Sequence, residues 1–261
     1  MCVFSASELI YAASLLKFNV LYGIPDVISS APEEYRSEII HDSMQSLMSK
    51  HCLDMDMDGN FSVGKELAEI LAYCSLCDAV LSVSVRTEDD IEDIRVLWRY
   101  KDLYLQGIVV DNSYQFFFLT EQEVRNVLGL YSELKPCSAD VETITVPYTI
   151  LRKIKRFQKH ADVFNATKQV MAYGASYEFA EDIALSLLEL NAFHMYSLTL
   201  TNGENIENKG IAFSEAAHSY VVIRQETEDF KTNVVFSKAS SDELKAKIAT
   251  VFSEFLLKTE V

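Results

Sequence analysis

The sequence is poor in the residues that interrupt regular structure, with only 8 glycines and 4 prolines among 261 residues. Because Gly and Pro mark turns and loops, their scarcity argues against long flexible linkers. No apolar run approaches the roughly 18 residues that a membrane-spanning helix needs, so we expect no membrane insertion. Hydrophobic residues nevertheless make up 49% of the chain. This composition is typical of a globular protein with a sizeable core.

Basic residues are outnumbered as well: 23 Lys and Arg stand against 39 Asp and Glu, for a formal net charge of −16. A surface this negative repels phosphate backbones and anionic headgroups. We therefore expect no nucleic acid partner and no attachment to anionic membranes. The charge fits a surface that keeps the protein soluble, and a dedicated electrostatic docking role is the alternative.

Cysteines are few, odd in number and irregularly spaced, unlike the disulfide framework of a secreted protein. They are Cys2, Cys52, Cys74, Cys77 and Cys137. The first residues also lack the basic start of a signal peptide, and together these features predict a cytoplasmic protein. Cys74 and Cys77 form a lone CxxC without the two further ligands that zinc needs. The pair falls at the end of a predicted helix, where the thiol pKa is raised, so we expect both to be structural.

One acidic loop resembles the first half of an EF-hand. Asp54, Asp56 and Asp58 occupy loop positions one, three and five, and a glycine follows at position six. Position twelve, which should supply a bidentate carboxylate, is Lys65. The simpler interpretation is a solvated turn, with Ser62 capping the next helix. We therefore predict no metal and no cofactor, and a calcium-binding regulatory protein using residues 54–58 is the first alternative.

Motifs that would carry catalysis are missing from the sequence. The five histidines form no HExxH, HxH or HxxxH pattern, and no GxSxG, GxGxxG or GxxxxGK[ST] occurs. We predict that the protein is not an enzyme. An enzyme whose site leaves no sequence motif is the second alternative.

Periodicity predicts helices over residues 7–18 and 64–77, a valine-rich strand over 79–85, and a hairpin of strands 103–110 and 114–119. Residues 94–100 read as a strand or a short helix. A capping box at residues 120–123 opens another helix. Residues 135–140 read as a linker, followed by a strand over 142–146 and a helix that starts at Pro147.

The second part of the chain repeats the order of the first: helix, strand, crossing segment, hairpin and capped helix. Residues 66–70 correspond to 178–183, residues 82–85 to 197–200, and the capping box at 120–123 to that at 240–243. Strands over 219–224 and 232–237 complete the repeat. The fold class is therefore α+β, a central antiparallel sheet flanked by helices and built from two pseudo-repeated halves, residues 1–135 and 141–261. The hairpins favour helices on one side of a sheet that both halves share.

Residues 114–119 are aromatic on both faces of their strand. A strand in a sheet covered on one side needs only alternate apolar positions. Helices on both sides, or a partner protein, must therefore cover this strand. If a partner protein covers the strand, the aromatic side chains of this region bind that partner. The candidate protein-binding residues are Trp98, Tyr100, Tyr104, Phe116 and Phe118.

The whole layout resembles the EspG family of type VII secretion (ESX) chaperones. The resemblance rests on Leu-Tyr-Gly-Ile-Pro at residues 21–25, the helix 66–71 leading into strand 80–85, the hairpin 102–120, and Thr-Ile-Thr-Val-Pro at 143–147. It implies a cytosolic adaptor that binds a helical protein client, a type VII secretion substrate, through a hydrophobic surface and keeps it soluble. No binding residue of that family is carried over to this chain.

Overall fold

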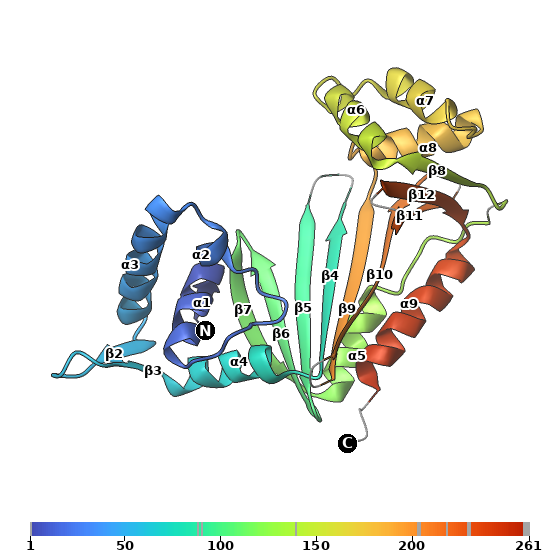
Figure 1. The fold of residues 1–261 in the computed structure, drawn as a ribbon. Coiled ribbons are helices and arrows are strands. Elements are labelled where there is room, and N and C mark those ends of the chain that lie inside the picture. Colours follow the sequence, from blue (N-terminus) through green and yellow to red (C-terminus); the bar gives the residue numbers. More distant parts are fainter. Residues whose placement is uncertain are drawn as a thin grey trace.

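A computed structural model describes residues 2–87, 89, 91–138, 140–202, 205–217, 219–228 and 231–257. Its centre is a ten-stranded sheet in the order β1-β7-β6-β5-β4-β9-β10-β11-β12-β8 (Figure 1). All neighbouring strands pair antiparallel. A separate two-stranded hairpin, β2-β3, lies between α3 and α4 in the chain. The predicted α+β class with a central antiparallel sheet is confirmed.

The strands of the large sheet are β1 (Val3–Ser5), β4 (Ala79–Arg86), β5 (Glu92–Tyr100), β6 (Leu103–Val110), β7 (Ser113–Leu119), β8 (Thr143–Pro147), β9 (Phe193–Asn202), β10 (Asn205–Glu215), β11 (Tyr220–Glu228) and β12 (Lys231–Ala239). The small hairpin consists of β2 (Leu53–Met55) and β3 (Phe61–Val63). The helices are α1 (Ala6–Leu15), α2 (Val27–Ser30), α3 (Glu33–Ser49), α4 (Lys65–Leu76), α5 (Glu121–Leu130), α6 (Tyr148–Gln158), α7 (Val163–Met171), α8 (Tyr177–Leu187) and α9 (Ser241–Leu256).

The element order repeats about the centre of the sheet. Apart from the small β2-β3 hairpin of the first half, each half runs strand, helices, four strands and a closing helix, from β1 to α5 and from β8 to α9. The halves join where β4 pairs with β9, and there Ser82 lies directly opposite Ser197. These two residues were matched as equivalents in the sequence, so a pseudo-twofold axis passes between them. Duplication as the origin of this symmetry, and the boundaries 1–135 and 141–261, remain our proposals.

Side-chain oxygens cap the helices where the sequence predicts them. Thr120 and Ser240 each accept a hydrogen bond from the backbone N–H three residues later, and the carboxylates of Glu123 and Glu243 accept one from the backbone N–H of Thr120 and Ser240. Ser5 and Glu8 form the same box at the start of α1. These boxes satisfy N–H groups that would otherwise lack an intrahelical partner. The predicted capping boxes are therefore confirmed.

Helices cover both faces of the sheet, so the expectation of helices on one side is wrong. We call the face that carries Val80, Ser82 and Ser84 of β4 the front face, and the face that carries Leu81 and Val83 the back face. Helices α5 and α9 cover the back face in one core cluster. Helices α1 and α4 with part of α3 cover the front face over β4–β7, and α6–α8 cover it over β11, β12 and β8. Strand β7 can therefore be aromatic on both faces without a partner.

Several local expectations also change. Residues 94–100 belong to strand β5, which resolves the choice between strand and helix. The acidic loop turns between β2 and β3, and α4 begins after Gly64, so Ser62 lies in a strand and caps no helix. The sequence interpretation did not identify β1, β10 or α7. Strand β1 is only three residues long, and β10 carries few apolar residues at alternate positions.

Trp98 is the centre of the front-face core beneath α1–α4. Its side chain is fully buried, and its indole N–H donates to the carbonyl of Tyr22 at 2.7 Å. Glycine provides the space on β6, because a Cβ at Gly107 would lie 2.9 Å from the indole ring. Gly23 has a φ of +76° and lies so close to β4 and β5 that a Cβ there would be 2.8 Å from Val96. The loop of residues 17–26 is thus held tightly against the sheet.

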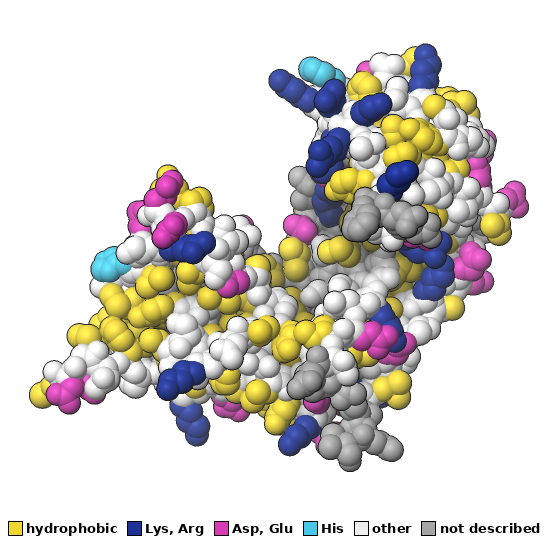
Figure 2. Space-filling view, viewed as in Figure 1, with side chains coloured by type: hydrophobic (Ala, Val, Ile, Leu, Met, Phe, Trp, Pro, Cys, Tyr) yellow, Lys and Arg dark blue, Asp and Glu magenta, His cyan; other side chains and the backbone are white. Residues whose placement is uncertain are grey.

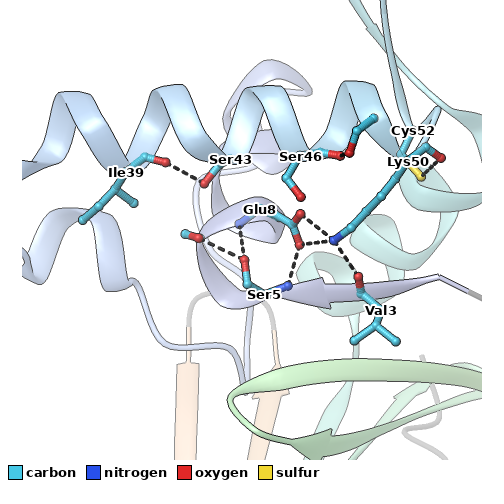
Figure 3. A network of polar contacts seen from close by, with 10 residues as sticks. Val3, Ser5, Glu8, Ile39, Ser43, Ser46, Lys50 and Cys52 are labelled. Carbon is cyan, nitrogen blue, oxygen red and sulfur yellow. Dashed lines mark hydrogen bonds and ion pairs between the residues drawn. The ribbon is translucent and has the colours of Figure 1, made fainter.

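A polar network ties the start of α1 to the end of α3 (Figure 3). Glu8 is 3% exposed, and its carboxylate lies 2.6 Å from the Lys50 ammonium. Lys50 also donates to the carbonyl of Val3 at 2.7 Å, and the Ser5 N–H donates to Glu8 at 2.6 Å. Burial raises the pKa of Glu8, but the hydrogen bonds from Lys50 and its neighbours outweigh this and hold the pKa below its usual value.

Candidate protein-binding groove

The middle of the front face has no helix packed on it in the described part of the chain. The α1–α4 unit and the α6–α8 unit stand apart at opposite ends of the sheet, with β4, β5 and β9 between them (Figure 1). Figure 2 shows the hollow that separates the two lobes. The exposed strip, which we call the groove floor, consists of Ser82, Ser84, Met195, Ser197, Thr199, Asn208, Gly210 and Ala212.

Strand register places these side chains on one surface. Ser82 pairs with Ser197 across β4 and β9, and Ser197 pairs with Gly210 across β9 and β10. Directly paired residues point to the same face of an antiparallel sheet. None of the eight floor residues is fully buried, and none belongs to the three core clusters of the described chain. The floor is therefore a surface built by strands from both halves.

The chemistry of the floor is small and neutral. Hydroxyl groups and short side chains dominate it, and Thr199 donates to the Asn208 side chain at 2.8 Å. A Cβ at Gly210 would lie 2.9 Å from the Tyr196 carbonyl oxygen, so glycine fits this position better than any larger residue. Glycine inside a strand often marks a close approach by another backbone. Met195, which is 44% exposed, adds a flexible apolar contact.

The walls of the groove come from the two helical units. On one side the loop of residues 17–26 lies over β4 and β5, and its Val20 side chain is half exposed. Behind this loop a cavity of about 790 Å³ opens among α1, α2 and α3. On the other side stand α6–α8, which pack on β8, β11 and β12. A ligand on the floor would thus contact both halves.

The five aromatic residues predicted to bind a partner do not form one surface. Trp98, Tyr104 and Phe116 are 0%, 2% and 7% exposed and pack in the chain's own core. Tyr104 lies on the back face, where its ring is 6.2 Å from that of Phe255. Binding by these residues remains a prediction. Because these three side chains are buried, they could contact a partner only if the core rearranged.

Only Tyr100 and Phe118 of that set reach the surface. Phe118 is 49% exposed, Tyr100 is partly exposed, and both rings pack against Tyr73 of α4 at centroid distances of 5.3 and 6.2 Å. We therefore propose these two as a secondary contact. The floor residues were missed because serine and threonine on a strand usually indicate solvent. The alternation of Ser82 and Ser84 with Leu81, Val83 and Val85 was the available signal that one face of β4 is only partly covered.

The acidic loop of residues 54–58 is part of the β2-β3 hairpin, whereas an EF-hand loop is flanked by two helices. The Asp56 carboxylate accepts hydrogen bonds from the N–H groups of Asp58 and Asn60 at 2.9 and 2.8 Å, so it holds the turn. Across the residues that the structure describes, no group of three or more His, Cys, Asp or Glu side chains is placed to hold a metal ion. Calcium binding at this loop has no further geometric support.

The two cysteines of the CxxC pair are inaccessible. Cys74 and Cys77 are 0% and 3% exposed, whereas Cys2 is exposed. Burial raises the pKa of Cys77 to about 12 and that of Cys74 well above its usual value. Because the thiolate is the reactive form, we expect iodoacetamide to modify Cys2 quickly in the native protein while Cys74 and Cys77 react only after denaturation. Mass spectrometry of the alkylated protein checks this, and rapid native labelling of Cys77 would contradict it.

The fold is of the EspG type. The structure is similar to that of the Mycobacterium tuberculosis type VII secretion system chaperone EspG5, solved in complex with a PE25–PPE41 dimer. The TM-score is 0.53 at 12% sequence identity, over 96% of this chain and 95% of that chain. No protein-family model matches the sequence, and no curated protein matches it. No helix among the described residues is both long and apolar enough to cross a membrane.

Proposed function

We propose that this protein is a non-catalytic chaperone or adaptor that holds a helical segment of a client protein in the groove between its two helical units. The observation that carries the proposal is the uncovered strip of sheet where the two halves meet. The fold shared with EspG5, a secretion chaperone solved with a bound protein dimer, supports it. On this proposal the protein is a divergent EspG-like member that works in the cytoplasm on a type VII secretion substrate.

The dimensions of the groove floor favour a helix as the occupant. The floor spans β4, β9 and β10, and neighbouring strands lie about 4.8 Å apart, so its width is about 10 Å. An α-helix with its side chains is about 10–12 Å across. The short side chains of Ser197, Gly210 and Ala212 allow such a helix to approach the sheet closely. Met195 and the loop of residues 17–26 supply apolar contacts beside it.

The residue composition of the groove floor favours binding over catalysis. The eight floor residues include no histidine, cysteine or carboxylate, so the serine and threonine hydroxyls of the floor have no general base among them to activate them as nucleophiles. The polar groups that are present are neutral hydroxyls and one amide. Such groups orient a bound chain by hydrogen bonds without changing it chemically.

A bulky charge on the floor should abolish client binding without unfolding the protein. Ser197→Arg places a long cation at the centre of the strip, whereas Ser62→Arg places the same side chain on β3, an exposed strand of the separate hairpin. We expect Ser197→Arg to weaken client binding at least tenfold, about 1.4 kcal/mol, and Ser62→Arg to leave it unchanged. Both variants should melt within a few degrees of the wild type.

The client is first recovered by cross-linking and affinity purification from the native host, and is then produced on its own for titration. Circular dichroism establishes whether it is helical, and calorimetry measures its affinity for each variant. The proposal fails if no recovered protein binds the wild type in pure form. It also fails if the Ser197→Arg and Ser62→Arg proteins bind the client equally well.

A further inference from the structure

Positive charge gathers on one helical unit of this acidic protein. The segment of residues 143–177 holds six of the 23 Lys and Arg residues but only one of the 39 acidic residues, Asp162. Figure 2 shows Lys and Arg side chains clustered on the lobe formed by α6–α8, along the edge that faces the hollow. One wall of the groove is therefore basic, although the chain as a whole carries a charge of −16.

Helix α6 arranges four of these residues on a single face. Arg152, Lys155, Arg156 and Lys159 follow the i, i+3, i+4, i+7 spacing that lines up side chains along a helix. All four are exposed, while Ile150 and Ile154 on the opposite face are buried against the sheet. The exposed Tyr148 lies at the N-terminal end of the same face. We call the four cations the α6 basic stripe.

Among the described residues, no carboxylate forms an ion pair with the stripe. Several basic side chains on other elements are paired, as in Lys50–Glu8, Arg86–Glu189 and Lys238–Glu142. Asp162, the acidic residue of the segment, instead caps α7 by accepting hydrogen bonds from Asn165. In a chain with an excess of carboxylates, four adjacent cations are left available to an external partner.

We propose that the α6 basic stripe binds an acidic helical face of the client protein. This inference rests on the proposed function, because it takes the occupant of the groove to be a helix. Seven residues of helix rise about 10.5 Å, so the stripe matches carboxylates at i, i+4 and i+7 of a client helix. The floor then contacts the small or apolar face of that helix, and the stripe contacts its acidic face.

A protein segment fits the stripe better than an extended anionic surface does. A membrane or a DNA duplex that approached α6 would also meet the field of the acidic remainder of the chain. Electrostatic interactions between exposed charges extend about 8 Å at physiological ionic strength. A single client helix can lie within that distance of the stripe without covering the acidic remainder of the surface. The stripe therefore recognises a local acidic face and selects against clients with a basic one.

The test uses two synthetic helical peptides that differ only in charge. One carries Glu at i, i+4, i+7 and i+11 of an alanine-rich, fluorescein-labelled helix, and the other carries Gln at these positions. Fluorescence anisotropy at about 0.15 M salt, where the screening length is about 8 Å, measures both affinities. We expect the wild type to bind the Glu peptide at least tenfold more tightly than the Gln peptide. The quadruple variant Arg152→Glu, Lys155→Glu, Arg156→Glu, Lys159→Glu should lose this preference.

A matched control changes the net charge equally at other exposed positions. Its substitutions are Lys65→Glu, Arg125→Glu, Lys245→Glu and Lys247→Glu, all outside the groove, and it should keep the preference for the Glu peptide. Thermal melting establishes that both quadruple variants are folded. The proposal is overturned if the wild type binds the two peptides equally, or if the control loses the preference as fully as the stripe variant. Tighter stripe-dependent binding of phosphatidylserine vesicles or duplex DNA would also overturn it.

The groove proposal and the acidic-contact proposal can be disproved independently of each other. Ser197→Arg should weaken both peptides, because it blocks the floor on which either helix would lie. Reversal of the stripe should weaken only the Glu peptide. If Ser197→Arg changes neither affinity while the stripe variant loses the Glu peptide, the acidic contact stands and the groove proposal fails. If Ser197→Arg weakens both peptides equally and stripe reversal changes nothing, the groove stands and the acidic contact is wrong.

Discussion

Replacement of Trp98 by alanine is expected to lower the free energy of unfolding by roughly 3–5 kcal/mol, the range for a fully buried Trp or Phe. The indole is 0% exposed, and it packs over Gly107 and beside the Phe116 ring, whose centroid is 5.8 Å away. Its removal leaves a cavity under α1–α4 and leaves the Tyr22 carbonyl without its indole donor. Urea unfolding followed by circular dichroism measures the loss.

Two further variants separate the causes of this loss. Trp98→Phe keeps most of the ring volume but removes the N–H donor, so it should lose about 1–3 kcal/mol. Phe118→Ala, at a position that is 49% exposed, should lose well under half of what Trp98→Ala loses. Near-wild-type stability of Trp98→Ala, together with lost client binding, would show that Trp98 is a binding residue and that the buried assignment is wrong.

Replacement of Glu8 by glutamine should destabilise the protein by about 2–3 kcal/mol at neutral pH, somewhat below the range for breaking a fully buried ion pair. Glu8 accepts hydrogen bonds from Lys50 and from the Ser5 N–H, and glutamine cannot compensate the Lys50 charge. The value lies below that range because the Lys50 side chain is 30% exposed, so water solvates the stranded ammonium. Glu38→Gln, on the exposed part of α3, is the matched control and should change stability little.

The same pair predicts a dependence on pH. The folded-state pKa of Glu8 is held below its ordinary value of 4.5, so the folded state binds a proton less readily than the unfolded state. The stabilisation is therefore fully present above pH 4.5 and is lost as the pH falls through and below that value. Unfolding curves between neutral pH and pH 3 should show the wild type losing more stability than Glu8→Gln. Parallel pH profiles for the two proteins would contradict the assignment.

Much of the fold could be predicted because it is encoded locally. Capping boxes such as Thr120–Glu123, and the alternation of valine and serine in β4, depend on residues only a few positions apart. The matched segments at Ser82 and Ser197 also anticipated the symmetry of the sheet. Which face of a strand is covered could not be predicted in this way. Strand register places Trp98 and Phe118 on the same face, but the position of α1–α4 makes one buried and the other half exposed.

The groove and the stripe were missed for different physical reasons. The floor forms when β4 and β9 pair, and its residues Ser82 and Ser197 look like ordinary solvent-facing positions in their own strands. The stripe lies within one short segment, from Arg152 to Lys159, but the chain as a whole has a net charge of −16. A sum over the whole chain conceals a local cluster of opposite sign. Charge counted segment by segment would have revealed it.

The pairing of β4 with β9 has a consequence for the newly made chain. Strand β4 ends at Arg86, but the strand that pairs with its other edge does not begin until Phe193. Until that part has been synthesised, the first half presents eight residues of unpaired strand backbone. Open edges of this kind join readily to strands of other chains, and domains generally fold from the N-terminus during synthesis. The protein is therefore most vulnerable to aggregation on the ribosome, before its own second half closes the sheet.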